Sequence, residues 1–282
     1  MEKIFVSGEY FNVHDTLSCG QVFRYKRYKQ GYMVFSKDKC AYVYNDGEFA
    51  IITCEKCDER YFKNYFDLHK DYSKIVSEAK SSNSEILRRS SELAKGIRIL
   101  NQDATETLFS FMISQNNNIP RIKKSLEEIC ENYGEKKTFL GEEYYTFPNE
   151  KSLLNADENS LAKLGLGYRA KYLVNLIKIL NEGYDLEGLR AFDTEQLKSE
   201  LMKIYGVGPK VADCVSFFGF NKTDSFPVDT WLEKVYREDY LGTIKSREKI
   251  SKYFVEIYGQ NAGYFQQYLF YYKRSLQKKD KE

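Results

Sequence analysis

The hydrophobic pattern of this chain changes once, and that change limits the folds open to it. Up to about residue 55, the segments QVFRYKRYKQGYMVF and CAYVYNDGEFAIIT are rich in aromatic and β-branched residues, and Gly31 and the Asn45-Asp46-Gly47 turn punctuate them as hairpins. From DERYFKNYFDL onward, apolar residues recur at helical spacing instead. Because strands precede helices, the sequence predicts an α+β fold with an antiparallel β domain and flanking helices over residues 1–100, followed by a mostly helical domain over residues 101–282.

Four helices of the second part can be placed from apolar residues at helical spacing. One covers residues 122–133, and another covers residues 173–180 and ends near Gly183, a typical C-terminal capping residue. Two more are predicted over residues 246–259 and 263–277. Short connections between such helices indicate a helical domain with its own core.

Charge and cysteine content exclude several classes of protein. The chain has 43 Lys and Arg against 41 Asp and Glu, a net charge of +2, so only local clusters of basic residues could indicate a nucleic acid partner. Six scattered cysteines, with no long apolar run at the N-terminus, favour a reduced cytoplasmic protein that does not enter a membrane. The C-x-x-C at 54–57 lacks the second pair of a zinc site, and no cysteine follows Cys214, which excludes a C-terminal four-cysteine iron–sulfur cluster.

The segment TEQLKSELMKIYGVGPKVADCVSFFGF (194–220) predicts two helices joined by a Gly-Val-Gly turn at residues 206–208. Glycines allow positive φ at such a turn and bring backbone N–H groups close to an anion, at a helix N-terminus that already favours negative charge. A DNA phosphate fits such a site without any base being read. The alternative is an ordinary tight turn between two helices, which glycine also serves.

A lysine follows this turn within an otherwise apolar helix. Lys210 and Cys214 are four residues apart and therefore share a helix face, where an amine in a partly desolvated pocket is a candidate nucleophile. Asp229, in the segment FPVDTW, lies where a helix begins, and the helix dipole is expected to keep its carboxylate ionised. A lysine with its ammonium group in solvent and a plain N-cap are the structural alternatives.

The segments GVGPKVADCV and PVDTW resemble the helix-hairpin-helix DNA glycosylases that carry a catalytic lysine and an aspartate, specifically the 8-oxoguanine DNA glycosylases of eukaryotic type and their bacterial relatives. Four further segments match in order: SCGQVFRY (18–25), where the family has a strand, LFSFMISQNNNIPRI (108–122), LGLGYRAKYL (164–173) and GYFQQYLF (263–270). The resemblance covers nearly the whole chain. It implies an N-terminal sheet like that of TATA-binding protein, packed on a helical helix-hairpin-helix glycosylase domain.

The resemblance also implies a base-excision repair enzyme that removes 8-oxoguanine, preferably opposite cytosine, and then cleaves the strand as an AP lyase. Lys210 would attack C1′ of a nucleotide flipped out of the duplex, and Asp229 would support that step. The base pocket would consist of Gly20, Cys214, Gln266 and Phe270. Cys214 and Phe270 would clasp the base, Gln266 would bond its Watson–Crick edge, and the Gly20 carbonyl would accept from N7–H, which guanine lacks.

Further roles follow from the same resemblance. Asn116 would fill the space that the flipped nucleotide leaves in the duplex, and Tyr168 would act as a wedge beside it. Arg121 and Arg169 would contact the unpaired cytosine of the partner strand. The alternative for both arginines is a solvated helix position. The groups implied for the hairpin are the amides of Gly206, Gly208 and Val211, for a DNA phosphate, and the carbonyls of Met202, Ile204 and Val207, for a monovalent cation or Ca²⁺.

The chain departs from the family pattern at two positions. Relatives commonly carry a histidine two residues after the aspartate, where this chain has Trp231, and an acidic partner where it has Lys273. We hypothesise that Lys273 takes over part of a phosphate contact. The expected partner is double-stranded DNA bound by a monomer, with no required cofactor. The alternatives are a related glycosylase for another damaged base and a DNA-binding module without catalysis.

Overall fold

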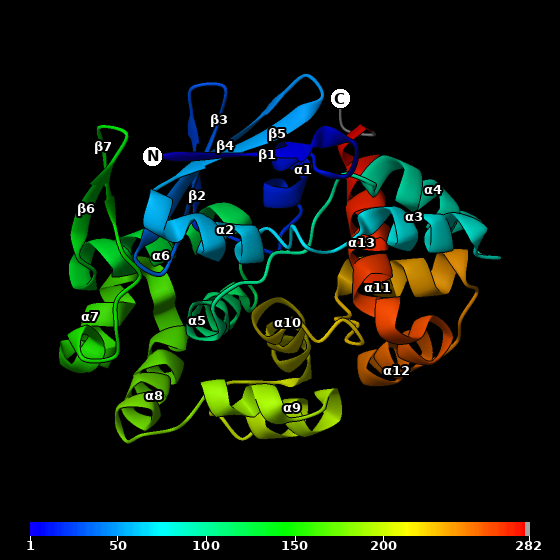
Figure 1. Ribbon diagram of the computed structural model, residues 1–282. Helices are drawn as coiled ribbons and strands as arrows, with labels where there is room; N and C mark the ends of the chain where they lie inside the picture. The colour runs from blue at the N-terminus through cyan, green and yellow to red at the C-terminus, as the bar shows by residue number, and fades with distance from the viewer. Residues whose placement is uncertain (280–282) are drawn as a thin grey trace.

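The N-terminal strands pair into one antiparallel sheet, as predicted. The computed structural model describes residues 1–279, and the side chains of residues 1–276. The strand order is β1-β5-β4-β3-β2 (Figure 1). The strands are β1 (Glu2–Ser7), β2 (Tyr25–Tyr28), β3 (Gly31–Ser36), β4 (Lys39–Asp46) and β5 (Phe49–Cys54). Gly31 begins β3 instead of forming the turn, and a Cβ there would lie only 2.2 Å from the Val43 carbonyl oxygen, so glycine allows β3 and β4 to pair.

Between β1 and β2, the structure differs from the sequence-based expectation. A short helix, α1 (Val13–Ser18), follows β1, and residues 19–24 form a turn and an irregular segment. The segment SCGQVFRY is therefore not a strand, and only Tyr25 enters β2. The reason is that side chains from elsewhere in the molecule occupy carbonyls of this segment, which leaves it without a sheet partner.

The helices build the rest of the molecule, and a small hairpin that the sequence did not predict lies among them (Figure 1). The helices are α2 (Glu59–Tyr65), α3 (Tyr72–Ser81), α4 (Glu85–Ala94), α5 (Ala104–Ser114), α6 (Ile119–Tyr133), α7 (Glu158–Leu161), α8 (Ala170–Asn181), α9 (Thr194–Leu201), α10 (Pro209–Phe220), α11 (Thr230–Lys234), α12 (Arg247–Tyr258) and α13 (Ala262–Lys279). The hairpin consists of β6 (Lys136–Phe139) and β7 (Glu142–Tyr145). The helices predicted over residues 122–133, 173–180, 246–259 and 263–277 correspond to α6, α8, α12 and α13.

The hydrophobic residues form separate cores for the sheet and for the helices. One core joins apolar residues of the sheet with those of α1, α2 and Leu100. The other joins apolar residues of the helices from α3 to α13. Helix α10 lies in the centre of the helical layer, buried from Val211 to Phe220, and packs against α5 and α9 (Figure 1). A domain boundary near residue 100 stays a proposal, since α4 precedes it yet packs on α13, and α3 packs on α4.

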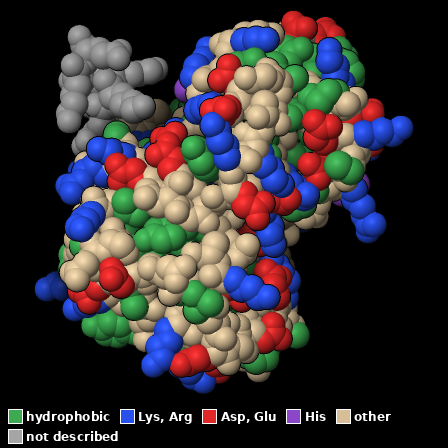
Figure 2. Space-filling model, turned by 90° about the vertical axis from the view of Figure 1, so that its left-hand side faces the viewer, with side chains coloured by type: hydrophobic (Ala, Val, Ile, Leu, Met, Phe, Trp, Pro, Cys, Tyr) green, Lys and Arg blue, Asp and Glu red, His purple; other side chains and the backbone are tan. Residues whose placement is uncertain are grey.

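The surface carries charges of both signs. On the face shown in Figure 2, Lys and Arg side chains are interspersed with Asp and Glu instead of being gathered into one basic patch. This matches the near-neutral total of the sequence. Among the helices of residues 1–279, none has the length and apolar character needed to cross a membrane.

Candidate active site

Helix α10, the start of α11, helix α13 and the turn after α1 surround a small cavity. All six residues predicted for catalysis and for the base pocket line it: Gly20, Lys210, Cys214, Asp229, Gln266 and Phe270. They come from four separate segments of the chain. The cavity measures about 60 Å³, which is space for a few water molecules and not for a purine. A flipped base could therefore enter only if side chains of the wall moved.

Lys210 presents its amine to this cavity from the first turn of α10. The helix begins at Pro209, which needs no hydrogen-bond acceptor at that position, and its remaining residues are apolar enough to bury the helix. The half-buried Lys210 side chain makes no hydrogen bond or ion pair within the described residues, and its Nζ lies 6.0 Å from the Phe111 ring centroid. The amine is thus held beside an aromatic wall, without a protein group that would occupy it.

Asp229 is the N-cap of α11 and faces the same cavity. Its Oδ1 accepts hydrogen bonds from the amides of Trp231 (2.9 Å) and Leu232 (3.0 Å). Burial raises the pKa of the Asp229 carboxyl above its ordinary value, while the capped amides and the Lys210 ammonium act in the opposite direction. The predicted N-cap is confirmed, whereas the ionised state expected for the Asp229 carboxylate stays a prediction, because burial acts against the capped amides.

Cys214 lies one helical turn after Lys210 and is only 4% exposed. Burial raises the pKa of its thiol to about 12, so the sulfur stays protonated near neutral pH. A buried thiol of this kind is a small apolar surface and a poor nucleophile. The structure therefore gives the two neighbours on this face different properties, since the lysine offers an amine and the cysteine offers packing.

Gln266 contributes an acceptor that has no donor. Its side chain is buried in α13, and Nε2 donates to the Pro227 carbonyl at 3.1 Å. Within the described residues, nothing donates to the buried Oε1. Leaving a buried acceptor unpaired costs about 1–3 kcal/mol, and a ligand that brings a donor recovers this cost. Phe270, one turn further along α13, completes this side of the cavity.

Gly20 closes the cavity from the turn after α1. Its φ of +94° is one that glycine adopts without strain. No donor bonds to its carbonyl in the part of the chain that the structure describes. A Cβ at this position would lie 3.6 Å from the Phe270 ring, so the glycine backbone comes close to the aromatic wall. The turn thus brings a second unpaired acceptor to the cavity wall.

A second group of predicted residues gathers around the turn between α5 and α6. Asn116 has a positive φ of 47°, and its Nδ2 lies 3.3 Å from the Tyr168 hydroxyl. Arg169 is only 6% exposed and donates to the carbonyls of Gln115 (2.8 Å), Asn116 (2.9 Å) and Leu166 (3.3 Å). Its guanidinium also lies 4.5 Å from the Tyr168 ring centroid. The view of Arg169 as a solvated residue is therefore wrong, and protein carbonyls accept from four of its five N–H groups.

Arg121 lies apart from this buried arginine. It is exposed on the first turn of α6, and across residues 1–276 its side chain takes part in no recorded hydrogen bond or ion pair. The rest of the asparagine triplet explains the turn itself. Asn117 bonds the Ile113 carbonyl at the end of α5 (3.1 Å), and the Asn118 side chain caps α6 by accepting from the Arg121 amide (3.1 Å).

The predicted helix-hairpin-helix is formed by α9, a Gly-Val-Gly turn and α10. The turn needs Gly206, whose φ is +91° and where a Cβ would lie 2.4 Å from the Tyr172 ring. The amides of Gly206, Gly208 and Val211 donate no hydrogen bond to other described residues, so all three are available to an anion. Gly208 is the N-cap of α10 and has no side chain to cover those amides.

Comparison with known proteins assigns the family. A model of the 8-oxoguanine DNA glycosylase N-terminal domain matches residues 3–108, and a model of the HhH-GPD superfamily of base excision DNA repair proteins matches residues 109–260. The chain belongs to the family of 8-oxoguanine DNA glycosylase/lyases. The probable N-glycosylase/DNA lyase of Methanothermobacter thermautotrophicus is 31% identical over 229 residues, which is 74% of this chain and 72% of that protein. The N-glycosylase/DNA lyase of Saccharomyces cerevisiae is 38% identical over 161 residues, 52% of this chain but only 42% of the yeast protein.

A solved structure extends the match over nearly the full length. The 8-oxoguanine glycosylase/lyase of Clostridium acetobutylicum, in complex with double-stranded DNA containing cytosine opposite 8-oxoguanine, superimposes with a TM-score of 0.90 at 37% identity. The alignment covers 95% of this glycosylase and 93% of the Clostridium chain. Both the sheet and the helical layer are therefore shared, and not the hairpin alone.

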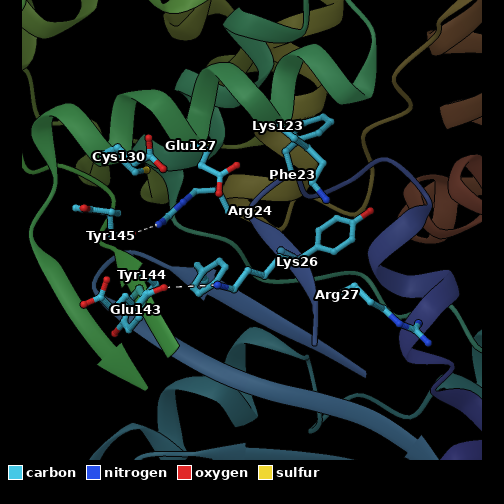
Figure 3. A pocket seen from close by; sticks show the side chains of 13 residues that line it. Phe23, Arg24, Lys26, Arg27, Lys123, Glu127, Cys130, Glu143, Tyr144 and Tyr145 are labelled. Atoms are coloured by element: carbon cyan, nitrogen blue, oxygen red, sulfur yellow. Dashed lines mark hydrogen bonds between the residues drawn. The ribbon is translucent and has the colours of Figure 1, made fainter. Parts of the chain in front are cut away.

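A larger cavity of this glycosylase lies between β2, α6 and β7 (Figure 3) and measures about 580 Å³. It contains none of the predicted site residues. Arg24, which points into it, is bonded to the Glu106 carboxylate (3.1 Å) and the Tyr145 carbonyl (2.7 Å). The Lys123 ammonium lies 3.6 Å from the Tyr25 ring centroid. These cations already have partners, whereas in the smaller cavity the Lys210 amine and the Gln266 Oε1 acceptor have none within the described residues.

The structure also bears on the departure at residues 231 and 273. The Lys273 ammonium lies 2.8 Å from the Glu238 carboxylate and 2.7 Å from that of Asp239. Two carboxylates therefore hold the amine that we expected to contact phosphate, which disfavours that hypothesis. Sequence reasoning did not single out Arg274, the next residue, whose guanidinium packs on the Phe270 ring of the pocket wall. The only feature of the sequence that could have pointed to Arg274 is its position four residues after Phe270, on the same helix face. Helical periodicity alone does not assign a function to that position.

Proposed function

We propose that the protein excises 8-oxoguanine paired with cytosine from duplex DNA and then cleaves the strand at the resulting site by β-elimination. One observation carries this proposal: an unoccupied amine, a buried carboxyl group and two unpaired acceptors line the same cavity. The Clostridium relative, solved with cytosine opposite 8-oxoguanine, supports this choice of substrate.

The acceptors fit the edges of 8-oxoguanine. A guanine-type Watson–Crick edge carries the N1–H and N2–H₂ donors, and Gln266 Oε1 can accept one of them. The Gly20 carbonyl can accept from N7–H, which 8-oxoguanine has and guanine lacks. Guanine would place the N7 lone pair against this oxygen, and such a mismatch is rejected far more strongly than a missing methyl group. Cys214 and Phe270 would lie against the two faces of the base.

The chemistry follows from the amine. The neutral Lys210 Nζ forms a bond to C1′ while the C1′–N9 bond breaks, and the proton that the amine releases neutralises the departing base. Opening of the sugar ring gives a Schiff base between Lys210 and C1′. Loss of a C2′ proton then expels the 3′ phosphate as the C3′–O bond breaks. The Asp229 carboxylate would stabilise positive charge on the sugar during the first step.

The partner strand would be held by the second group of residues. Asn116 would fill the vacated space, Tyr168 would enter beside it, and Arg121 and Arg169 would read the acceptors of the unpaired cytosine. Arg121 has its donors free for this contact. Arg169 would contact the base with its remaining N–H group or exchange one of its carbonyl partners for the base.

The hairpin would bind a phosphate of the damaged strand through the amides of Gly206, Gly208 and Val211. A cation at the hairpin fits the donor set, since within the described residues the carbonyls of Met202 and Val207 accept no hydrogen bond, whereas that of Ile204 accepts from the Val207 amide (3.0 Å). These three oxygens would hold a monovalent cation or Ca²⁺, which would add positive charge beside the phosphate. We place the enzyme in the cytoplasm as a monomer, consistent with its six free cysteines.

Borohydride trapping tests the proposal. The wild-type protein should form a covalent adduct with duplex DNA carrying 8-oxoguanine opposite cytosine, and Lys210→Gln should form none while still binding the duplex. Lys252→Gln, an exposed change on α12, is the control for loss of one positive charge. A wild-type protein that binds this duplex without releasing the base, and gives no adduct, would refute the proposal in favour of a non-catalytic DNA-binding module. Release of a different damaged base would point to a related glycosylase.

A further inference from the structure

The turn that carries Gly20 is held by side chains from other elements, and they leave one carbonyl free. The carbonyls of residues 18, 19 and 21 each accept a side-chain hydrogen bond, whereas the Gly20 carbonyl between them accepts none from the described residues. The bonds run from Arg274 to Ser18 (2.6 Å), from Gln267 to Cys19 (3.0 Å) and from Gln102 to Gln21 (2.8 Å). The backbone is thus fixed on both sides of Gly20, which lines the pocket.

Arg274 connects this turn to the aromatic wall. It lies one helical turn after Phe270 on α13, and its guanidinium carbon is 5.2 Å from the Phe270 ring centroid. A Cβ added to Gly20 would lie 3.5 Å from its Nη1. One planar cation therefore contacts the ring that would face the base and bonds the turn that would read it.

We propose that Arg274 is a positioning residue that gives the pocket its selectivity for 8-oxoguanine over guanine. The inference rests on the proposed function and names a determinant of the same site. Arg274 acts through Gly20 and Phe270, without touching the base itself. Gln267 has the same role from the same helix, with a neutral hydrogen bond in place of a charged one.

The physical reason lies in the freedom of the turn. Glycine at φ +94° can take many other conformations, so a Gly20 carbonyl without support would sample several directions. Discrimination between N7–H and a lone pair depends on direction, because a hydrogen bond weakens steeply when it is misaligned. The charged bond from Arg274 to Ser18 and the bond from Gln267 to Cys19 remove that freedom before the base arrives.

The test separates base recognition from sugar chemistry. Arg274→Met keeps much of the aliphatic packing and removes the donors and the charge. We expect kcat/KM for 8-oxoguanine opposite cytosine, and with it the ratio of this value to that for guanine opposite cytosine, to fall by about 10- to 30-fold, the loss of one charge-assisted hydrogen bond. Cleavage of duplex DNA with a preformed abasic site should stay within about 2-fold of wild type, because no base occupies the pocket there. Arg274→Lys should recover part of the loss.

Two further variants keep the test decisive. Arg89→Met removes an exposed arginine on α4, which packs on α13, and should leave both activities unchanged. Gln267→Met should reproduce the pattern of Arg274→Met with a smaller amplitude, and it serves if Arg274→Met unfolds in thermal melting. Unchanged excision, or a parallel loss of excision and abasic-site cleavage, would overturn the proposal. A wild-type protein that fails to excise 8-oxoguanine would instead defeat the proposed function.

Discussion

The two sides of the proposed DNA-binding region are prepared to different degrees. On the lesion side, Cys214 and Gln266 are buried and the turn at Gly20 is bonded in advance, so that within the described residues two acceptors, Gln266 Oε1 and the Gly20 carbonyl, are left for a ligand. On the partner-strand side, Tyr168 and Arg121 are exposed and Arg169 is bonded to protein carbonyls. The lesion side is therefore built for one ligand, whereas the partner side would have to rearrange when DNA binds.

The degree of burial on each side predicts how strongly that side selects its base. In a buried site an unpaired acceptor cannot be satisfied by water, so a base that fails to supply a donor is rejected strongly. At an exposed site water competes for each contact, and a wrong partner base costs less. We therefore expect strict selection of the damaged base and a weaker selection of the base opposite, and the following variants test this contrast.

The largest effect is expected on the lesion side, at Asp229. Asp229→Asn keeps an N-cap acceptor for α11 but removes the charge, and should lower the excision rate by about 100- to 1000-fold with little change in DNA affinity. Burial raises the pKa of Asp229, so when the pH is lowered the wild-type rate should begin to fall at a higher pH than an ordinary aspartate would give. The variant should lack this acidic limb of the pH–rate profile. Single-turnover kinetics between pH 4 and 8 measure both. A limb that persists in the variant would assign it to another group.

The second effect concerns the unpaired acceptor. Gln266→Leu should lower kcat/KM for 8-oxoguanine by about 100-fold through loss of the Watson–Crick contact, while abasic-site cleavage is preserved. The free energy of unfolding should change little, because two effects oppose each other. The variant removes a buried unpaired acceptor, which is stabilising, and leaves the Pro227 carbonyl without its donor, which is destabilising. Denaturant unfolding provides that control. An equal loss on both substrates would show that Gln266 serves the sugar chemistry.

The third effect is on the partner-strand side, where the buried arginine serves the fold as well. Arg169→Gln leaves several carbonyls of residues 115, 116 and 166 without donors, and should lower the free energy of unfolding by about 2–3 kcal/mol. The preference for cytosine should fall, with selectivity for 8-oxoguanine over guanine retained. Urea unfolding and excision opposite each of the four bases measure the two quantities. Unchanged stability would contradict the bonding described for Arg169.

The smallest effect is expected at the exposed arginine. Arg121→Gln should reduce the preference for cytosine by about 5- to 10-fold and leave the free energy of unfolding within about 0.5 kcal/mol of wild type. The same panel of four duplexes tests it, with Arg89→Met as the control for charge. If Arg121→Gln instead altered selectivity between 8-oxoguanine and guanine, the contrast between the two sides would fail.

The sequence predicted the parts of this molecule that local pattern determines. The α+β order and helices α6, α8, α12 and α13 follow from periodicity, and the fold class is confirmed by the structure and the relatives. Helix α1 and the β6–β7 hairpin were missed because they are short and carry little apolar pattern. The segment 18–25 was wrongly expected to be a strand, since the side chains that bond the Ser18 and Cys19 carbonyls come from α13, about 250 positions away in the chain.

The site was predicted to a different extent. Motif resemblance selected six residues that line one cavity in the structure, and their proposed roles stay predictions. Neither the raised pKa of Asp229 nor the contacts of Arg274 could be read from the sequence, because each depends on what surrounds the side chain after folding. The amine of Lys273 shows the same limit, as its two carboxylate partners are on a different segment.

The small volume of the cavity that Cys214 and Phe270 line also affects how the enzyme would search a genome. Every purine that it tests would have to push the wall aside before any bond could form, and an intact guanine would lack the bond from N7–H to the Gly20 carbonyl that helps to offset that work. Intact bases would therefore be released quickly, and the protein could inspect long stretches of sound DNA without being delayed at each one.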